Sequence, residues 1–371
     1  MEQELFNKYL YNYIHLLSAY LNDSKLGDKS IDDKELSFYI KLSKFHSLSA
    51  LLYKAIVDTG VKVNKQYLGK LEQAYLYNVR KSVSFDKERE ELYKYLNDNK
   101  IDYLPLKGII IKEYYKDPMS REFADNDILF DDSKKEIVKQ FFVDRGYEIV
   151  LYNRTNHDEY IKKPFYNFEM HRGLVDNNYE NIDIFLKYYD NYLMHCPIKN
   201  NCEHYQSKEE FYIYFTIHSY KHYRTGGCGL RTLVDYYLYL KNNELDFGFI
   251  NIELDKLWLV NFSNLISSLS IKLFDNKELN EEEKKMLLFI ASSGTYGTIG
   301  NRVDTGVNKK GKMRYFLSRV FPPVATYKYR YPWAYKHHIL VPIAWLLRSL
   351  RVIFTKHSLI NQELKEIKKH K

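Results

Sequence analysis

The alternation of apolar and polar residues divides the chain into helical and strand-forming regions. In "ELSFYIKLSKFHSLSALLYKAI", apolar residues recur at three- and four-residue steps, which places them along one face of a helix. The same period returns from Ser207 to about residue 292. We therefore predict a helical N-terminal region over residues 1–98 and a helical domain over residues 201–292.

Short strand-like runs lie between these two regions. They cover residues 101–106, 122–130, 147–153, 157–162 and 167–174. A helix is predicted over residues 133–145, because Ser133 and Glu136 have capping-box spacing and Gly146 follows the last turn. This order of elements predicts an α+β fold, in which a mixed β-sheet with flanking helices forms a compact core over residues 99–200.

The last part of the chain, residues 293–371, differs in composition from the rest. It opens with "SGTYGTIGNRVDTGVNKKG", whose glycines predict a loop, and continues as a basic, aromatic segment. Residues 309–371 contain fifteen lysines and arginines against Glu363 and Glu366, a net charge of +13, whereas the whole chain carries +8. Any long-range attraction to phosphate groups or anionic lipid therefore resides in this segment.

The amino terminus and the cysteines indicate the cellular compartment. The stretch "MEQELFNKYLYNYIHLL" carries acids and tyrosines where a signal peptide has a basic start and an unbroken apolar run, so we expect a cytoplasmic protein. Cys196, Cys202 and Cys228 are odd in number and lack Cys-x-x-Cys spacing. This argues against a disulfide framework and against structural zinc, and we expect reduced thiols.

Two acids interrupt an otherwise apolar strand in "SREFADNDILF". Because side chains alternate along a strand, Asp125 and Asp127 face the same side. Like charges about 6.7 Å apart on one face repel unless water or a cation lies between them. A divalent cation would remove the conflict. The alternative is an edge strand whose acids face water.

A second candidate element precedes the two acids. In "YLPLKGIIIKEYYKDPMSR", a short strand leads into Lys107 and Gly108, and an apolar, aromatic helix follows. Glycine permits close backbone approach, a helix start offers N–H groups, and lysine adds a full positive charge, so the layout is typical of phosphate binding. A tight turn with an exposed lysine is the alternative.

A third element is "YNFEMHRGL", in which Glu169 and His171 alternate with apolar residues in a strand. If this strand pairs beside the strand with the two aspartates, Glu169 faces the same cavity. The alternatives are a solvated edge glutamate and a histidine that serves only as a structural hydrogen-bonding group.

A basic cluster follows in "FTIHSYKHYR", where His218, Lys221 and His222 share one helical face. The His-x-x-x-His spacing matches zinc ligands on a helix, but Ser219 stands where zinc proteases have glutamate, and no third ligand is evident. We therefore favour a solvated or phosphate-facing basic patch over zinc. The "TGGCG" stretch that follows is predicted to be a loop.

The ordered set of motifs resembles the uncharacterised bacterial nucleotidyltransferase family NTP_transf_5, of the DNA polymerase β-like superfamily, over most of residues 35–350. The matching positions are Leu106, Lys107, Gly108, Tyr115, Pro118, Arg121, Asp125, Asp127, Glu169 and His171. The chain departs from the family at Asn126, where an apolar residue is usual, and it lacks the Gly-Gly or Gly-Ser pair of the wider superfamily.

The resemblance implies transfer of a nucleoside monophosphate from a triphosphate such as ATP to a hydroxyl acceptor, with release of pyrophosphate. Asp125, Asp127 and Glu169 would hold two Mg²⁺ ions, or Mn²⁺, because these hard cations prefer carboxylate oxygens. Glu169 would also help to activate the acceptor hydroxyl. The triphosphate would be bound by Lys107, Gly108 and Arg121 and, from the helical domain, by His218, Lys221 and Arg231.

Two other classes of function stay open, and the acceptor, which includes nucleic acid among its alternatives, is not identified by the sequence. One class is a nucleotide-binding protein without turnover, and the other is an interaction protein that acts through its basic C-terminal segment. A kinase is disfavoured, since neither a P-loop nor a kinase catalytic-loop motif is present in the sequence.

The segment "RYPWAYKHHILVPIAWLLRSLRVIFTKH", residues 330–357, has two interpretations. Its apolar run from Ile339 to Leu347 is shorter than the roughly 20 residues that span a bilayer. It could form a helix docked on the protein. It could also form an interfacial helix that attaches the protein to the anionic inner membrane surface, with Trp333, Tyr335 and Trp345 at headgroup depth, near a lipid-linked acceptor.

Overall fold

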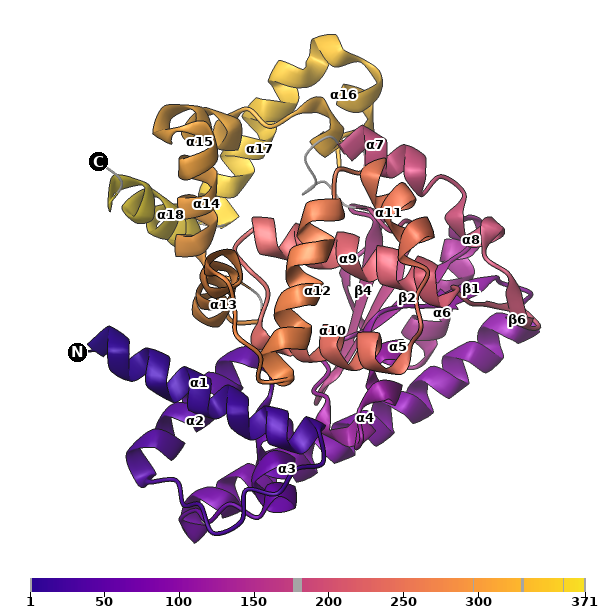
Figure 1. Cartoon of the computed structure of the whole chain (residues 1–371). Coiled ribbons are helices and arrows are strands. Elements are labelled where there is room, and N and C mark those ends of the chain that lie inside the picture. Colours follow the sequence, from indigo (N-terminus) through magenta and orange to yellow (C-terminus); the bar gives the residue numbers. More distant parts are fainter. Residues whose placement is uncertain (1, 176–181, 296, 328–329, 356, 370–371) are drawn as a thin grey trace.

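A seven-stranded mixed sheet lies at the centre of the molecule, with helices on both of its faces (Figure 1). The computed structural model describes residues 2–175, 182–295, 297–327, 330–355 and 357–369. Helices precede the sheet in the chain and follow it, so the predicted α+β fold with helical N- and C-terminal regions is confirmed. The predicted domain boundaries stay a prediction.

Four helices form the N-terminal region, as the hydrophobic period predicted. They are α1 (Glu2–Leu21), α2 (Asp33–His46), α3 (Ser49–Thr59) and α4 (Lys65–Asp98). The side chain of Asp32 caps α2 by accepting from two backbone N–H groups, and Gly60 ends α3 with a positive φ of 79°. α4 has 34 residues and is therefore roughly 50 Å long.

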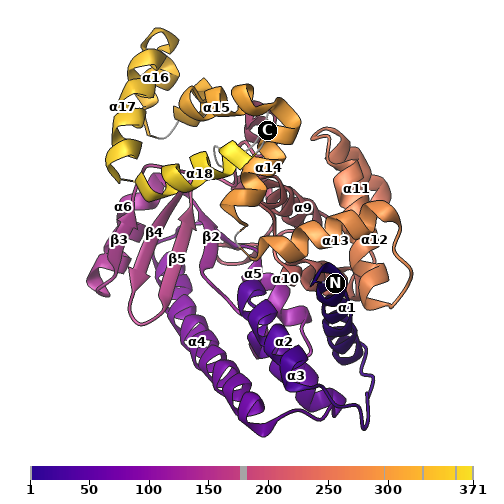
Figure 2. The same cartoon turned by 90° about the vertical axis from the view of Figure 1, so that its left-hand side faces the viewer.

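α4 holds the segment that leads into the aspartate strand through three contacts. Asn78 Nδ2 donates to the carbonyl of Met119 at 2.6 Å, and Lys81 Nζ donates to the carbonyl of Phe123 at 2.6 Å. Farther along the helix, Arg89 donates to Asn126. Figure 2 shows α4 beside the sheet, with the C-terminal helices at the other end of the strands.

The sheet has the strand order β3-β4-β5-β2-β1-β7-β6. The strands are β1 (Tyr103–Pro105), β2 (Asn126–Phe130), β3 (Glu148–Leu151), β4 (His157–Lys162), β5 (Tyr166–His171), β6 (Ile198–Asn200) and β7 (Glu203–His204). β2 pairs with β5 in parallel and with β1 in antiparallel orientation. The expectation that the Glu169 strand lies beside the aspartate strand is therefore confirmed.

The predicted strand over residues 122–130 is too long at its start. β2 begins at Asn126, so Asp125 lies just before the strand. Residues before it are bound to helices instead of to a neighbouring strand, because the carboxylate of Glu122 accepts from the backbone N–H of Ala50 at 3.0 Å and Lys81 bonds the carbonyl of Phe123.

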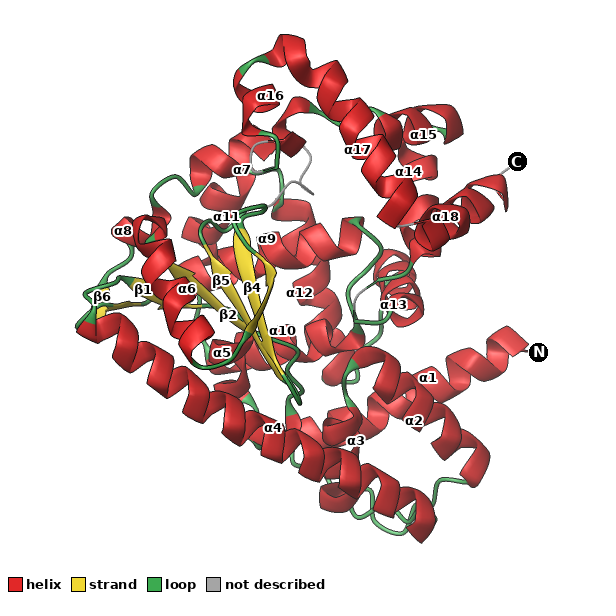
Figure 3. Ribbon diagram, turned by 180° about the vertical axis from the view of Figure 1, so that it is seen from behind, coloured by secondary structure: helices red, strands yellow, loops and turns green. Residues whose placement is uncertain are grey.

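Period-two alternation gives the sheet one apolar face and one face with carboxylates. Ile128, Phe130, Phe168 and Met170 are buried against α4 and α6 (Lys135–Asp144), which lies across the strands in Figure 3. The intervening residues Asp127, Glu169 and His171 face the opposite side. The apolar core thus fixes the direction in which the carboxylates point.

The predicted capping box of α6 is wrong. The helix begins at Lys135 after a 3₁₀ turn over Asp132–Lys134, and the side chain of Asp131 accepts from the backbone N–H of Ser133. Glu136 instead accepts a hydrogen bond from the Tyr152 hydroxyl. The predicted end is confirmed, since Gly146 follows the helix with a φ of 74°.

A long helix begins at the point where the helical period returns in the sequence. Ser207 and Glu210 form a capping box at the start of α9 (Lys208–Arg224). The helices that follow it are α10 (Leu230–Asn242), α11 (Phe247–Asp255), α12 (Val260–Phe274) and α13 (Glu281–Ser293), whereas α7 (Ile182–Tyr188) and α8 (Tyr192–His195) lie between β5 and β6. One hydrophobic core joins these helices to the N-terminal helices and to Leu129 of the sheet.

The predicted loop at residues 293–311 contains a helix. The C-terminal helices are α14 (Ile299–Lys310), α15 (Lys312–Val320), α16 (Pro332–Lys336), α17 (Val341–Thr355) and α18 (His357–Lys369). Thr298 caps α14, and Val303 and Val307 are buried one turn apart. Gly306 is used for packing, because a Cβ there would lie 2.2 Å from the Tyr315 ring. Gly306 therefore allows close packing against Tyr315 and does not mark a turn.

Candidate active site

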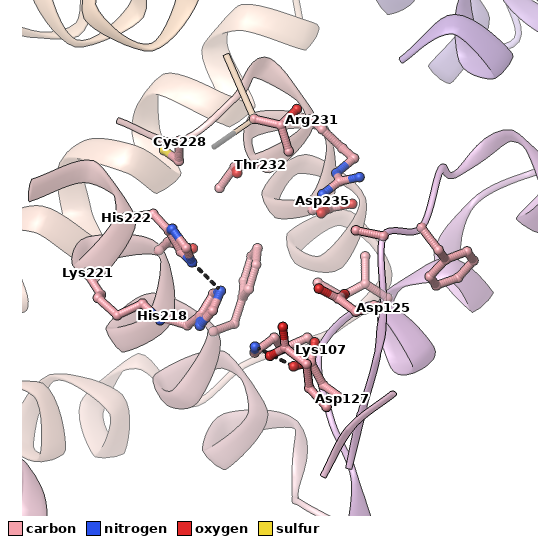
Figure 4. A pocket seen from close by; sticks show the side chains of 18 of the residues that line it. Lys107, Asp125, Asp127, His218, Lys221, His222, Cys228, Arg231, Thr232 and Asp235 are labelled. Atoms are coloured by element: carbon pink, nitrogen blue, oxygen red, sulfur yellow. Dashed lines mark hydrogen bonds and ion pairs between the residues drawn. The ribbon is translucent and has the colours of Figure 1, made fainter. Parts of the chain in front are cut away.

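A cavity of about 310 Å³ separates the carboxylate face of the sheet from α9 and α10 (Figure 4). All the site residues predicted from the sequence line it: Lys107, Gly108, Arg121, Asp125, Asp127, Glu169, His218, Lys221 and Arg231. Residues that are far apart in the sequence are thus brought to one place, although their individual roles stay predictions.

Asp127, Glu169 and His171 form the centre of the cavity floor. The parallel register of β2 and β5 pairs Asp127 with Glu169, and His171 follows two residues later on the same face. His171 Nε2 lies 2.7 Å from Asp127 Oδ1 and 3.6 Å from Glu169 Oε2. Within the described ranges this is the one group of three side chains whose ligand atoms lie close enough together, within 4.8 Å, to hold a metal ion.

The two aspartates have different electrostatic environments. Burial and the neighbouring charge of Asp127 raise the pKa of Asp125 to about 7. Burial acts in the same direction on Asp127, but the Lys107 ammonium and the hydrogen bond from His171 outweigh it and lower the pKa of Asp127 below its ordinary value. Asp127 is therefore the carboxylate that stays charged. The repulsion between the two aspartates that the sequence predicted raises the pKa of Asp125.

Lys107 contacts the same carboxylate oxygen as His171. Its Nζ lies 2.9 Å from Asp127 Oδ1, and its backbone has a positive φ of 46°, which is unfavourable for a residue with a side chain. The helix that follows is shorter than predicted, since α5 (Gly108–Ile111) is a single turn continued by a 3₁₀ turn over Lys112–Tyr114. Positive charge at this point therefore comes from the lysine side chain and not from a long helix.

Arg121 is buried in the cavity wall and already has an ionic partner. Its Nε and Nη2 donate to the two carboxylate oxygens of Asp235 on α10 at 2.9 and 2.8 Å, and the Tyr115 hydroxyl donates to the same carboxylate at 2.7 Å. A Cβ at Gly108 would lie 2.7 Å from Arg121 Nη1. Gly108 thus permits the close approach of Arg121, a use that the sequence did not indicate.

The opposite wall of the cavity comes from α9 and from the start of α10. His218 Nε2 lies 2.9 Å from His222 Nε2, and Lys221 lies beside them (Figure 4). Burial, together with the charge of Lys107, holds the pKa of His218 well below its ordinary value. His218 is therefore neutral near pH 7, and its predicted contact with the triphosphate stays a prediction. Arg231 Nη1 donates to the carbonyl of Glu122 at 2.7 Å.

A comparison with known protein families gives a match over more than half of the chain. The model of the uncharacterised nucleotidyltransferase family NTP_transf_5 matches residues 32–275, which run from the start of α2 to the end of α12. The chain belongs to this family. Searches of curated proteins and of solved structures gave no match. The family assignment supports nucleotidyl transfer as the class of reaction and a nucleotide as a substrate.

Asn126, where the resemblance led us to expect an apolar residue, has a structural contact. The Asn126 side chain is fully buried, and its Oδ1 accepts from Arg89 Nη1 on α4 at 3.0 Å. The residue therefore anchors the start of β2 to α4. It is not among the residues that line the cavity.

Several residues at or near the cavity, His171 among them, were not among the predicted site residues. Asp235 could have been noticed as an acid in the apolar stretch "RTLVDYYLYL". Tyr115 was recognised only as part of the family motif. His157 on β4 carried no signal in the sequence. Its Nε2 lies 3.9 Å from Glu169 Oε2, and burial and the nearby His171 lower its pKa to about 4.

The residues of this cavity fit a divalent cation. Asp127 and Glu169 offer oxygen atoms and His171 offers a nitrogen atom, a set that suits first-row divalent metals as well as Mg²⁺. Asp125 lines the same cavity and is repelled by the other two carboxylates. A bound cation would relieve that repulsion.

Proposed function

We propose that the protein transfers a nucleoside monophosphate from a nucleoside triphosphate, with ATP as the first candidate, to a hydroxyl acceptor. The acceptor oxygen forms a bond to the α-phosphorus, the bond from that phosphorus to the bridging oxygen breaks, and pyrophosphate leaves. The observation that supports this most directly is the pairing of Asp127 with Glu169 across parallel strands, with Asp125 in the same cavity. We expect the reaction in the cytoplasm.

Asp125, Asp127 and Glu169 would hold the divalent cations, for which we expect two Mg²⁺ ions, with Mn²⁺ as a substitute. When bound, such ions neutralise phosphate charge and make an acceptor hydroxyl more acidic. His171 adds a nitrogen atom to this set or orients Asp127 through its 2.7 Å hydrogen bond. This part of the cavity is therefore assigned to the reacting phosphate.

Glu169 is assigned the role of the base that accepts the proton of the acceptor hydroxyl. Although burial opposes it, the nearby His171 imidazole lowers the pKa of Glu169, so the carboxylate is charged and able to accept a proton near pH 7. Its Oε2 lies within 3.9 Å of His157 and 3.6 Å of His171. The two imidazoles limit the positions that this carboxylate can take.

Cations on the walls are assigned to the triphosphate. Lys107, Lys221 and Arg231 line the cavity from three different elements and would contact the leaving pyrophosphate, while neutral His218 would donate a hydrogen bond. Arg121 is assigned a positioning role in addition to its predicted phosphate contact, since two of its nitrogen atoms are already bonded to Asp235.

The test is pyrophosphate release from each nucleoside triphosphate in the presence of Mg²⁺ or Mn²⁺, followed by a search for labelled nucleoside monophosphate on cellular fractions. Activity that requires the metal and is lost in Asp127→Asn supports the proposal. Tight nucleotide binding without any pyrophosphate release from any fraction would overturn it.

A nucleotide-binding protein without turnover is the second candidate. It is favoured by one observation, namely that Lys107 and His171 already bind the Asp127 oxygen that a metal would use. In this case nucleotide affinity would be unaffected by a chelator. Calorimetric titration of the nucleotide with and without EDTA separates the two candidates, because the transfer reaction requires the cation.

A further inference from the structure

The C-terminal helix α17 presents apolar side chains on two opposite faces. One face packs within the protein, where Val341 and Ala344 are buried and the Trp345 indole donates to the carbonyl of Pro322 at 3.0 Å. A helix at the surface of a globular protein normally has a polar second face. The second face of α17 is instead apolar.

This second face forms a continuous stripe, which we call the α17 stripe: Ile343, Leu346, Leu347 and Leu350. These residues follow one another at three- and four-residue spacing, and between 43% and 60% of each side chain is exposed. Ile339, one turn before the stripe, is 87% exposed. Single exposed leucines are common, but a stripe of this length on one helix marks a contact surface.

The neighbouring helix α15 repeats the arrangement on a smaller scale. Met313, Phe316 and Leu317 are exposed at three- and four-residue spacing, with Met313 at 70%. Tyr315 points inward, where its hydroxyl donates to Glu363 at 2.8 Å. Exposed basic residues lie close to Met313 in the sequence: Lys309, Lys310, Lys312 and Arg314. Apolar and basic side chains therefore lie together on the surface of these helices.

The combination of apolar and basic side chains indicates which kind of partner binds this surface. Residues 309–371 carry a net charge of +13, so a second copy of the chain would bring two strongly positive segments together. Nucleic acid would satisfy the charge, but its outer surface of phosphates offers no apolar layer to the stripe. A membrane that contains anionic lipid offers both, since acyl chains accept the apolar side chains and headgroup phosphates attract lysine and arginine.

The structure changes which residues would make this contact. Trp333, Tyr335 and Trp345, expected at headgroup depth, pack instead around the small C-terminal core of Tyr327, Ala334, Val341 and Ala344. The aliphatic stripe takes their place. None of the helices over the described ranges has the length and apolar character needed to cross a bilayer. The contact would therefore be interfacial.

We propose that the α17 stripe and the exposed face of α15 attach the protein reversibly to membranes containing anionic lipid. The stripe lies at the boundary between headgroups and acyl chains, and the surrounding lysines and arginines contact the headgroups. This inference does not depend on the proposed nucleotidyl transfer, so either can fail without the other.

The test uses the full chain and sedimentation with two kinds of vesicle, one of phosphatidylcholine alone and one in which about a third of the lipid is phosphatidylglycerol. The protein should sediment with the second kind, and less so at high salt. The double variant Ile343→Glu, Leu346→Glu should reduce the partition coefficient roughly tenfold or more. Ile252→Glu on α11, where the side chain is 64% exposed, is the matched control and should have no effect.

Several outcomes would overturn the proposal. They are equal binding to both vesicles, no binding to either, and binding that the double variant leaves unchanged. A mass by light scattering that falls from dimer to monomer in the double variant would assign the stripe to a second copy. If circular dichroism shows that the double variant is unfolded, the proposal is judged on the unmodified chain. Its binding to vesicles must then require anionic lipid and must weaken at high salt.

Discussion

Two groups of buried charges line the same cavity, and they are balanced differently. In the first, the Arg121 guanidinium meets the Asp235 carboxylate in a two-point contact, and Tyr115 completes the group. In the second, Asp125, Asp127 and Glu169 lie near Lys107, His171 and Arg231. The first group joins one cation directly to one anion. In the second, Lys107 and His171 both bond one oxygen of Asp127, and Asp125 is repelled by the other two carboxylates.

The difference separates structural charges from charges that are available for chemistry. A buried ion pair with matched geometry is costly to break. Unmatched carboxylates repel, and the pKa of about 7 for Asp125, raised by burial and by Asp127, is the expression of that repulsion. A cation or a cationic complex of a nucleotide would complete the second group, whereas the first is complete already.

The largest effect is expected from neutralising the unmatched group. Asp127→Asn and Glu169→Gln should each lower the rate of nucleotidyl transfer at least about a thousandfold, because each removes a ligand of the cation. The measurement is pyrophosphate release per folded molecule, with folding checked by circular dichroism. Full metal-dependent activity in either variant would show that the site has been assigned wrongly.

Substitution in the Arg121–Asp235 pair should lower the stability of the fold. Asp235→Ala leaves the buried Arg121 without its carboxylate, and the free energy of unfolding in urea should fall by about 3–5 kcal/mol. Lys199→Ala, which removes an exposed ion pair with Glu203, serves as the control and should cost less than about 1 kcal/mol. Equal effects of the two substitutions would contradict the distinction between the groups.

A smaller effect is expected from Asp125→Asn in protein treated with EDTA. The pKa of Asp125 is raised from 3.8 to about 7 by burial and by Asp127, so the folded protein binds this proton more tightly than the unfolded chain. The free energy of unfolding should therefore fall as pH rises through this interval and level off above it. The variant should lose this part of the pH dependence, about 1 kcal/mol or more between about pH 5 and about pH 8. An unchanged slope would place Asp125 outside the repulsive group.

An effect of similar size is expected for the cation that contacts Asp127 and lines the cavity. Lys107→Ala should weaken nucleoside triphosphate binding about tenfold and monophosphate binding less, because the lysine is assigned to the leaving phosphates. Lys116→Ala, half-exposed and not among the residues that line the cavity, is the control. If calorimetry shows equal losses of affinity for the triphosphate and the monophosphate, Lys107 does not contact the pyrophosphate part of the nucleotide.

Much of the cavity floor could be predicted because it depends on local periodicity. Alternation along β2 and β5 places Asp127, Glu169 and His171 on one face, and the opposite face is apolar. The Arg121–Asp235 pair could not be predicted in this way. The two residues are 114 positions apart, and only the packing of α10 against the loop before β2 brings them together.

The errors in the fold have a common origin in residues that have more than one use. Glycines in residues 293–311 predicted a loop, yet Gly306 lies inside α14 because a ring needs the space there. Ser133 and Glu136 have capping-box spacing, yet the chain enters α6 through a 3₁₀ turn, and Asp131 caps that turn instead of the helix. Spacing alone does not distinguish these uses.

The three contacts of α4 fix the number of residues in this helix. Asn78, Lys81 and Arg89 hold the carbonyls of Met119 and Phe123 and the side chain of Asn126 from one side of a continuous helix. One residue inserted between Lys81 and Arg89 would rotate everything beyond it by about 100° and carry Arg89 away from β2. Substitutions on the outer surface of α4 do not change the number of residues between these contacts. Insertions and deletions between these contacts should therefore be excluded from functional relatives, however far their surface residues diverge.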